Sequence, residues 1–334
     1  MNTFLKYFFL VLIGLLGIQQ PSFADELEDI KRLYVFGDSL SDSGNDYVYT
    51  KRLFQPQIDI GVLPPDFPAV PPSVSPHKTY FKGRFSNGPV AVEYLCKFLE
   101  ICDKPSMKPS EGVVNFVGEK NLDFGYGGSE SGVSNLTPGG FPVPGALGQA
   151  QSFIQAYQAV GRPIPGNALY VVWTGANDYL LEPVTPPISQ VVGNIIQSME
   201  ALYSAGARKF LVPNLPDLGS VPIMQIFPVG SSAGFTYLTE AHNSALDQAL
   251  IAFRQAHGSA TVVGVDIFNL FVPLTTSLNP GIGPGGDCLL GNIYLCGDVD
   301  NFDSLNYLYW DIEHPTTAVH RLIAKEMLER LKHD

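Results

Sequence analysis

Short apolar runs rich in β-branched and aromatic residues alternate along the chain with longer segments in which apolar residues recur at helical spacing. The apolar runs predict strands at 33–36, 168–174, 208–212 and 260–267, with a less regular candidate near 113–117. The longer segments predict helices at 88–100, 147–160, 188–205, 235–256 and 315–332. Continuous apolar strands separated by helices are typical of a parallel sheet that helices cover on both faces. The pattern therefore predicts an α/β fold.

Two long segments interrupt this alternation. Residues 46–80 are rich in Pro and Tyr, and residues 274–308 are rich in Gly, Asn and Asp. Loops of this length are uncommon inside a compact domain and often carry function. We expect both to be loops that lie over a functional site.

The amino-terminal segment has the features of a secretory signal peptide. Lys6 precedes an apolar run from Tyr7 to Ile18, and small residues flank Phe23 in the Ser22-Phe23-Ala24 segment. The apolar run is too short to span a bilayer, and no later run is longer. We expect cleavage after Ala24 and a secreted or periplasmic protein in which residues 25–334 form a single domain.

The charge of the chain restricts its partners. Its formal net charge of −12 makes binding to nucleic acid or to an anionic membrane surface unfavourable. A neutral or zwitterionic substrate fits this charge better.

Four cysteines are present, and none stands in a C-x-x-C pair, which argues against a zinc or redox site. An even number of cysteines in an exported protein favours disulfides, and three pairings are open. The local pairing, Cys96–Cys102 with Cys288–Cys296, is favoured because each pair is close in sequence.

Small and polar residues follow three of the predicted strands and precede the last predicted helix. The carboxyl ends of parallel strands meet at one edge of a sheet, where such folds bind their ligands. We therefore expect four segments to lie together there: Gly37-Asp38-Ser39-Leu40, Gly175-Ala176-Asn177-Asp178, Asn214-Leu215-Pro216-Asp217 and Asp311-Ile312-Glu313-His314-Pro315.

The stretch LYVFGDSLSDSGN, residues 33–45, runs from a strand directly into a small and polar segment. One interpretation is a strand that ends in a tight loop and presents Ser39 to solvent. The other is an ordinary turn, because Gly, Asp, Ser and Asn are common turn residues.

Asp311 and His314 form a D-x-x-H pair. At this spacing the carboxylate can hold one imidazole nitrogen, leave the other free and stabilise the imidazolium. The helix start that follows disfavours protonation, so the two influences oppose each other. The pair suits a general base, although a helix cap or a surface pair would also explain it.

A serine that attacks an ester also needs donors for the oxyanion. Asn177 follows an apolar strand and a glycine, so its amide could point into the cleft. The run Gly125-Tyr126-Gly127-Gly128 would let a main-chain N–H approach closely. Ordinary turn chemistry is the alternative for both.

Taken together, these segments resemble the GDSL (also called SGNH) hydrolases, a family of esterases and lipases. The resemblance is carried, in order, by FGDSLSDSGN around Ser39, GRFSNGPVAVEYL at 83–95, GYGGS at 125–129, WTGANDYL at 173–180, VPNLPDLG at 212–219 and DIEHPTTAVH at 311–320. The sequences of the fourth and last segments are most similar to those of secreted bacterial lysophospholipases A and glycerophospholipid:cholesterol acyltransferases. The resemblance implies a flavodoxin-like three-layer α/β/α sandwich with a parallel sheet of about five strands.

The resemblance also implies catalytic roles. Ser39 would be the nucleophile, His314 the general base and then acid, and Asp311 its orienting partner. No metal or other cofactor would be needed.

The oxyanion hole implied by the resemblance has three donors: the N–H of Ser39, the N–H of Gly128 and the side chain of Asn177. Gly127 replaces Gly128 if the alignment is shifted by one residue. Many relatives carry Asn where this chain has Asp123, which is the one departure from the pattern.

A second motif competes for the nucleophile. Residues 230–234 read Gly-Ser-Ser-Ala-Gly and fit G-x-S-x-G, the nucleophile elbow of other hydrolases. Such an elbow follows a strand directly, but Pro228 stands in the preceding residues. We interpret the segment as a loop that leads into the helix at 235–256.

The function expected from the resemblance is hydrolysis of a lipid ester, such as a lysophospholipid or phospholipid, through an acyl-Ser39 intermediate. Acyl transfer to an acceptor alcohol such as a sterol and brief contact with a membrane surface are compatible with it. A carbohydrate-ester (acetyl) esterase is the alternative activity. A catalytically inactive surface-binding protein is the alternative from another class. The loop between Cys288 and Cys296 is a candidate lid because it precedes Asp311.

Overall fold

Six parallel strands form the central sheet of the protein. The computed structural model describes residues 29–181, 184–283, 285–286, 298 and 306–333. The strands, in spatial order, are β2 (Lys108–Pro109), β3 (Asn121–Asp123), β1 (Arg32–Gly37), β6 (Ala168–Trp173), β7 (Lys209–Pro213) and β8 (Thr261–Val265). The predicted parallel α/β fold is confirmed.

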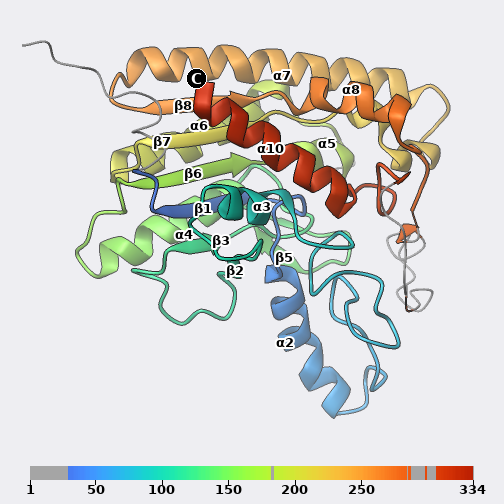
Figure 1. Cartoon of the computed structure of the whole chain (residues 1–334). Helices are drawn as coiled ribbons and strands as arrows, with labels where there is room; N and C mark the ends of the chain where they lie inside the picture. Colours follow the sequence, from blue (N-terminus) through green and yellow to red (C-terminus); the bar gives the residue numbers. More distant parts are fainter. Residues whose placement is uncertain (1–28, 182–183, 284, 287–297, 299–305, 334) are drawn as a thin grey trace, which may run out of the picture.

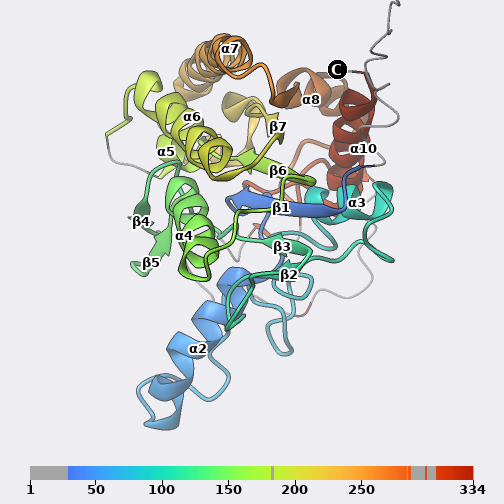
Figure 2. The ribbon, with the colours of Figure 1, turned by 90° about the vertical axis from the view of Figure 1, so that its left-hand side faces the viewer.

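Helices cover both faces of this sheet and complete a three-layer sandwich (Figures 1 and 2). One layer contains α3 (Ala91–Phe98), α8 (Ile267–Ser277) and α10 (Thr317–His333). The other layer contains α4 (Ala146–Ala159), α6 (Ile188–Ala205) and α7 (Ser231–Ala256). No helix among the described residues is long and apolar enough to cross a bilayer.

Successive side chains of the central strands enter different cores. Leu33 and Val35 of β1 pack with residues of α3 and α10, whereas Tyr34 and Phe36 pack with residues of α4, α6 and α7. Side chains alternate across a strand, so a strand covered on both faces must be apolar at every position. This is why the strand sequences read as continuous apolar runs.

The sheet edge beside β1 differs from the prediction. Residues 113–117 do not form a strand, and the edge is formed instead by β3 and the two-residue β2. Gly112 and Gly118 flank the segment with φ angles of 80° and 101°, which turn the chain away from an extended path.

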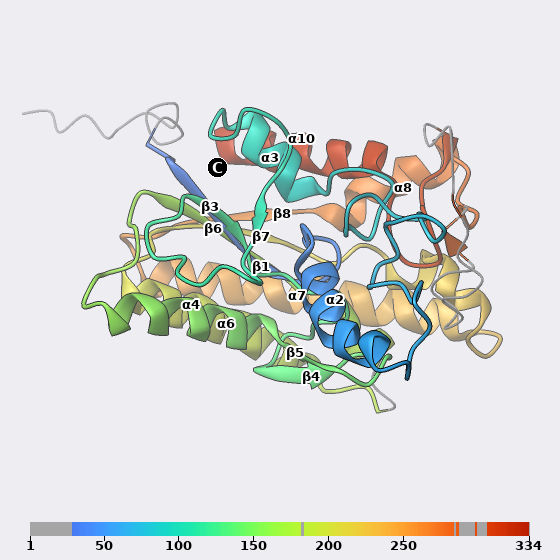
Figure 3. The same cartoon turned by 90° about the horizontal axis from the view of Figure 1, so that it is seen from below.

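Two helices lie where the sequence predicted loop or strand. The segment 46–80 begins with α2 (Asn45–Asp59), which projects from the sandwich (Figure 2), with Pro56 in its last turn. Figure 3 shows the β4–β5 hairpin (Ser134–Leu136 and Pro142–Pro144) at the same end of the molecule, where the rings of Tyr49 and Phe141 are 6.0 Å apart.

The predicted strand 260–267 stops at Val265, because Asp266 accepts a hydrogen bond from Asn269 N at 3.0 Å and caps α8.

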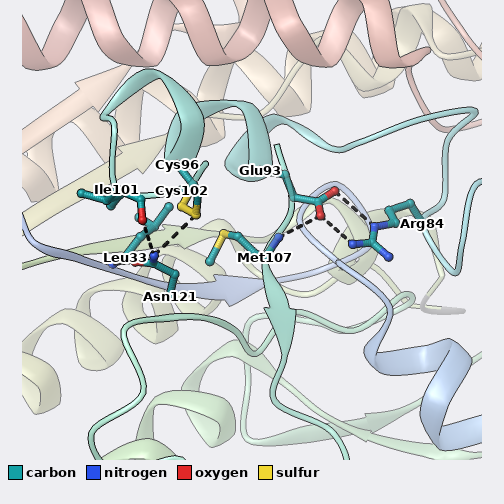
Figure 4. The surroundings of a disulfide bond; sticks show 8 residues. All are labelled: Leu33, Arg84, Glu93, Cys96, Ile101, Cys102, Met107 and Asn121. Carbon is teal, nitrogen blue, oxygen red and sulfur yellow. Dashed lines mark hydrogen bonds and ion pairs between the residues drawn. A yellow bond between two sulfur atoms is a disulfide. The ribbon is translucent and has the colours of Figure 1, made fainter. Parts of the chain in front are cut away.

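One expected disulfide is present. Cys96, in α3, and Cys102 are bonded, with their Cα atoms 5.4 Å apart (Figure 4). The Asn121 amide donates to Ile101 O at 2.8 Å and joins this loop to β3. Cys288 and Cys296 lie outside the described residues.

A buried ion pair connects the start of α3 with the segment before it. Arg84 Nη2 and Nε donate to the Glu93 carboxylate, at 2.6 Å and 3.2 Å (Figure 4). Glu93 also accepts hydrogen bonds from Val90 N and Met107 N, both at 3.0 Å. The pair therefore fixes the path of the chain from 84 to 107.

We predict that Arg84→Met destabilises the protein by about 3–5 kcal/mol, because it leaves the buried Glu93 carboxylate without its cation. Urea unfolding measures the loss. Lys108→Met is the control: Lys108 and Glu119 form a solvent-exposed pair at 2.9 Å, and its loss should change stability by less than about 1 kcal/mol. Equal effects of the two substitutions would contradict the prediction.

Candidate active site

The expected segments meet at the carboxyl edge of the sheet. Ser39 follows β1, Asn177 lies in the short helix α5 (Ala176–Leu180) after β6, and His314 precedes α10. All three residues line one cavity. Segments separated by more than a hundred residues are thus brought together by the parallel strands.

The backbone turns sharply at Ser39. Both Ser41 N and Asp42 N donate to Asp38 O, at 3.1 Å and 3.0 Å, so the chain enters a turn directly after β1. A Cβ atom at Gly37 would lie 2.4 Å from Trp173 O on the neighbouring strand, so only glycine fits there. Of the two interpretations of residues 33–45, a strand that ends in a tight loop is the observed one, but Ser39 is buried and not presented to solvent.

Asp311 and His314 are in direct contact. His314 Nδ1 lies 2.8 Å from Asp311 Oδ2 and 3.0 Å from Oδ1, and both side chains are buried. Asp311 Oδ1 also accepts hydrogen bonds from Glu313 N at 2.8 Å and His314 N at 2.7 Å. The carboxylate therefore both shapes the 311–314 turn and orients the imidazole.

The electrostatic environment of His314 favours its protonated form. Burial lowers the pKa of the imidazole, but the adjacent Asp311 carboxylate, with smaller contributions from Glu313 and Asp38, leaves the pKa raised above its ordinary value. The imidazolium that forms when the ring accepts a proton is therefore stabilised. The described residues show no hydrogen bond between Ser39 Oγ and His314, and such contacts commonly form only when substrate binds.

Asn177 is held beside the segment 127–131. Its Nδ2 donates to Ser129 O at 2.9 Å, which leaves the second amide hydrogen for another acceptor. The next residue, Asp178, accepts from Ser131 N at 2.8 Å and from Ser131 Oγ at 2.5 Å. These bonds fix the amide of Asn177 at the cavity.

The two candidate glycines differ in their contacts. Gly127 N donates to Asp42 Oδ2 at 3.3 Å, so its N–H already has an acceptor. Gly128 has a φ of 71°, and its carbonyl accepts from Asn135 Nδ2 at 2.7 Å. Gly128 precedes Ser129, which contacts Asn177, but it is not among the residues that line the cavity. These contacts disfavour Gly127, and the role of Gly128 stays a prediction.

The departure at Asp123 has a structural explanation. Its carboxyl group accepts from Ser43 N at 2.6 Å and from Gly125 N at 2.8 Å. It thereby ties the glycine-rich segment to the loop after Ser39.

Two aromatic residues that the sequence analysis did not single out contact the Asp311–His314 pair. The Tyr80 hydroxyl donates to Asp311 Oδ2 at 2.9 Å, and the ring of Phe85 lies 5.0 Å from the imidazole. Neither residue type suggests a role beside a titratable pair when read from sequence. The only sequence signal for either residue was the segment GRFSNG, which contains Phe85 and belongs to the stretch at 83–95 that carries the family resemblance.

The cavity is small and largely apolar. Its volume is about 30 Å³, which is room for about two water molecules. Its apolar walls are formed by Leu40, Trp173, Ala176, Leu180, Pro216, Leu218, Val221, Phe271, Tyr309, Pro315 and Ile323.

Two carboxyl groups, those of Asp38 and Glu313, also belong to residues that line the cavity, whereas no lysine or arginine lies among its described lining. Burial raises the pKa of Asp38 to about 7, and burial also raises the pKa of Glu313. The described residues contain no cluster that could hold a metal ion.

The competing serine lies elsewhere. Residues 231–234 form the first turn of α7 instead of the expected loop, because the helix begins at Ser231. Ser232 Oγ donates to Gly219 O at 2.5 Å, and Ser232 does not line the cavity of Ser39.

Comparisons with known proteins identify the family of the chain. A model of the GDSL-like Lipase/Acylhydrolase family matches residues 33–327. Two GDSL esterases/lipases of Arabidopsis thaliana are 26% and 27% identical, each over 90% of this chain and over 88% and 86% of their own. A solved structure of a lipolytic G-D-S-L protein from Veillonella parvula is 14% identical, covers 90% of this chain and 98% of its own, and has a TM-score of 0.43. A particular similarity to the bacterial lysophospholipases stays a prediction.

We predict that Asp38→Asn removes a pH dependence of stability. The pKa of Asp38 is raised from 3.8 to about 7, so the folded protein keeps a proton that the unfolded chain releases. The stability that this group contributes is full below about pH 4 and is lost as the pH rises through about 7. Relative to wild type, the variant should gain up to about 4 kcal/mol between pH 4 and pH 8. Urea unfolding of the variant and the wild type at both pH values measures this. The same difference in unfolding free energy between variant and wild type at pH 4 and pH 8 would refute the prediction.

Proposed function

Because the chain belongs to the GDSL-like Lipase/Acylhydrolase family, whose members are ester hydrolases, we propose that it hydrolyses carboxylic esters of lipids through an acyl-Ser39 intermediate. The observation that carries the proposal is the convergence of Ser39, Asn177 and His314 on one cavity, with Asp311 bonded to the imidazole at 2.8 Å.

In the proposed reaction, Ser39 Oγ attacks the ester carbonyl carbon while His314 Nε2 takes the hydroxyl proton. The N–H of Ser39, the N–H of Gly128 and the free amide hydrogen of Asn177 bind the oxyanion. The imidazolium then protonates the leaving alcohol, and the acyl group remains on Ser39. A water molecule, deprotonated by His314, attacks this ester. His314 returns the proton to Ser39 Oγ as the carboxylic acid leaves. Asp311 stabilises the imidazolium in both halves of the reaction.

The walls of the cavity indicate the kind of acyl group. Apolar side chains such as Leu180, Val221 and Phe271 suit a hydrocarbon chain. A lysophospholipid or another lipid monoester, as substrate of a lysophospholipase or phospholipase A, agrees with an apolar acyl group. We extend the proposal to acyl transfer onto an alcohol such as a sterol, which depends on how well the site excludes water.

The size of the cavity favours a second candidate. A volume of about 30 Å³ is room for a small group. An acetyl group, as in a carbohydrate acetyl ester, needs less space there than a long acyl chain. A long acyl chain would have to extend beyond the enclosed space.

We further propose that residues 1–24 are removed during export and that residues 25–334 act as a single secreted or periplasmic domain. The support is the order of charged, apolar and small residues in this segment. The proposed Cys288–Cys296 bridge and its role as a lid rest likewise on the sequence.

We predict that Ser39→Ala abolishes ester hydrolysis while the protein still unfolds at the wild-type urea concentration, since it removes only the nucleophile. Asn177→Ala should lower kcat by about 10²–10³-fold, as loss of an oxyanion donor does elsewhere. Ser232→Ala is the matched control and should keep wild-type turnover. Activity in Ser39→Ala, or its loss in Ser232→Ala, would contradict the proposed site.

We predict that kcat/KM for p-nitrophenyl esters rises with acyl length from acetate to palmitate if the lipid proposal is correct. The apolar walls give each added methylene about 0.8 kcal/mol when it is buried. A maximum at acetate with a steep fall thereafter would favour the acetyl esterase. The products formed from lysophosphatidylcholine with and without a sterol then separate hydrolysis from acyl transfer.

A further inference from the structure

Tyr80 connects the end of the 46–80 segment to the Asp311–His314 pair. Its side chain is buried, and its hydroxyl lies 2.9 Å from Asp311 Oδ2 and 3.4 Å from Gly285 O. Tyr80 N also donates to Pro72 O at 2.8 Å, which fixes the backbone that carries the ring. The hydroxyl is therefore held at the carboxylate by structure on both sides.

The two oxygens of Asp311 share the imidazole of His314 but differ in their other partners. Oδ1 lies 3.0 Å from His314 Nδ1 and accepts two backbone N–H groups of the 311–314 turn, from Glu313 and His314. Among the described residues, Oδ2 has only the His314 imidazole and the Tyr80 hydroxyl as partners. Tyr80 is thus the donor that reaches this carboxylate from outside its own turn.

The hydroxyl remains a donor at every pH at which an esterase would work. Burial, together with the negative charge of Asp311, raises the pKa of Tyr80 well above its ordinary value. The neutral phenol then stabilises the carboxylate charge, and hydrogen bonds to charged groups are among the stronger ones.

The residues that follow Tyr80 contact the imidazole of His314 and the residues directly after it. The ring of Phe85 packs on the imidazole with centroids 5.0 Å apart, and Ser86 Oγ donates to Pro315 O at 2.9 Å. Asn87 Oδ1 accepts from Thr317 N at 2.9 Å. Within this segment, Tyr80 is the residue whose polar group touches the carboxylate.

We propose that Tyr80 is a positioning residue of this active site, which aims the Asp311 carboxylate at His314 Nδ1 and disperses its charge. The inference rests on the proposed function, because it assigns a role in the same reaction. It predicts that turnover depends on the Tyr80 hydroxyl although this group touches no substrate atom.

Tyr80→Phe keeps the ring and removes only the hydroxyl. We expect kcat to fall by about tenfold or more with KM changed by less than about twofold, since the lost bond is to a charged group. Without the Tyr80 donor the charge of the Asp311 carboxylate is less dispersed and the carboxylate is more basic, so it raises the pKa of the imidazolium. The acidic limb of kcat/KM should therefore move to higher pH by about half a unit or more.

The other titratable groups near the imidazole are unchanged in this variant. They are Glu313 in the same turn, Asp38 after β1 and His320 in α10. A shifted acidic limb of the pH profile can thus be attributed to the Tyr80–Asp311 bond.

Tyr94→Phe is the matched control. The Tyr94 hydroxyl lies 3.0 Å from Thr317 Oγ1 between α3 and α10 and touches neither Asp311 nor His314. It should keep the wild-type kcat and pH profile.

A second substitution covers the case in which Tyr80→Phe does not fold. A 3-fluorotyrosine at position 80 keeps the contact and is a stronger donor, so it should move the acidic limb to lower pH. If the first variant changes only the urea unfolding midpoint, with kcat and the pH profile as in wild type, Tyr80 is a packing residue and the inference is wrong. An unshifted limb with fluorotyrosine overturns it equally. Turnover in Ser39→Ala would instead refute the proposed function itself.

Discussion

The buried carboxylate of Asp311 is the group on which the rest of the site depends. An isolated carboxylate without access to water is strongly disfavoured, so it needs several donors. Two backbone N–H groups, the imidazole of His314 and the hydroxyl of Tyr80 provide them. Satisfying one charge therefore fixes the 311–314 turn, the orientation of the imidazole and the end of the 46–80 segment together.

The sheet imposes the second constraint. β1 and β6 are neighbours in parallel register, with Gly37 paired to Trp173, so the loops that carry Ser39 and Asn177 leave the sheet side by side. The close approach of Gly37 to Trp173 O then excludes any side chain at the start of the turn. The cavity lined by Ser39, Asn177 and His314 has apolar walls and no lysine or arginine among its described lining residues.

Much of the fold and the main candidates of the site could be predicted from local patterns. Continuous apolar strands, helical periodicity and the polar residues at strand ends depend on neighbours in sequence. Where the sequence prediction was wrong, the difference lay in the local backbone: glycines with positive φ, Gly112 and Gly118, flank residues 113–117, and the cap by Asp266 ended β8 and began α8.

The sequence by itself determined the alternation of strands and helices, the turn after β1 and the three-residue spacing of Asp311 and His314. Each of these follows from residues within a few positions of one another. Only the tertiary structure decided which groups meet: that Tyr80 reaches Asp311 across 231 positions and that Asn177 is tied to Ser129. Neither contact has a local signature, because its free energy exists only once the sheet has brought distant segments within hydrogen-bonding distance.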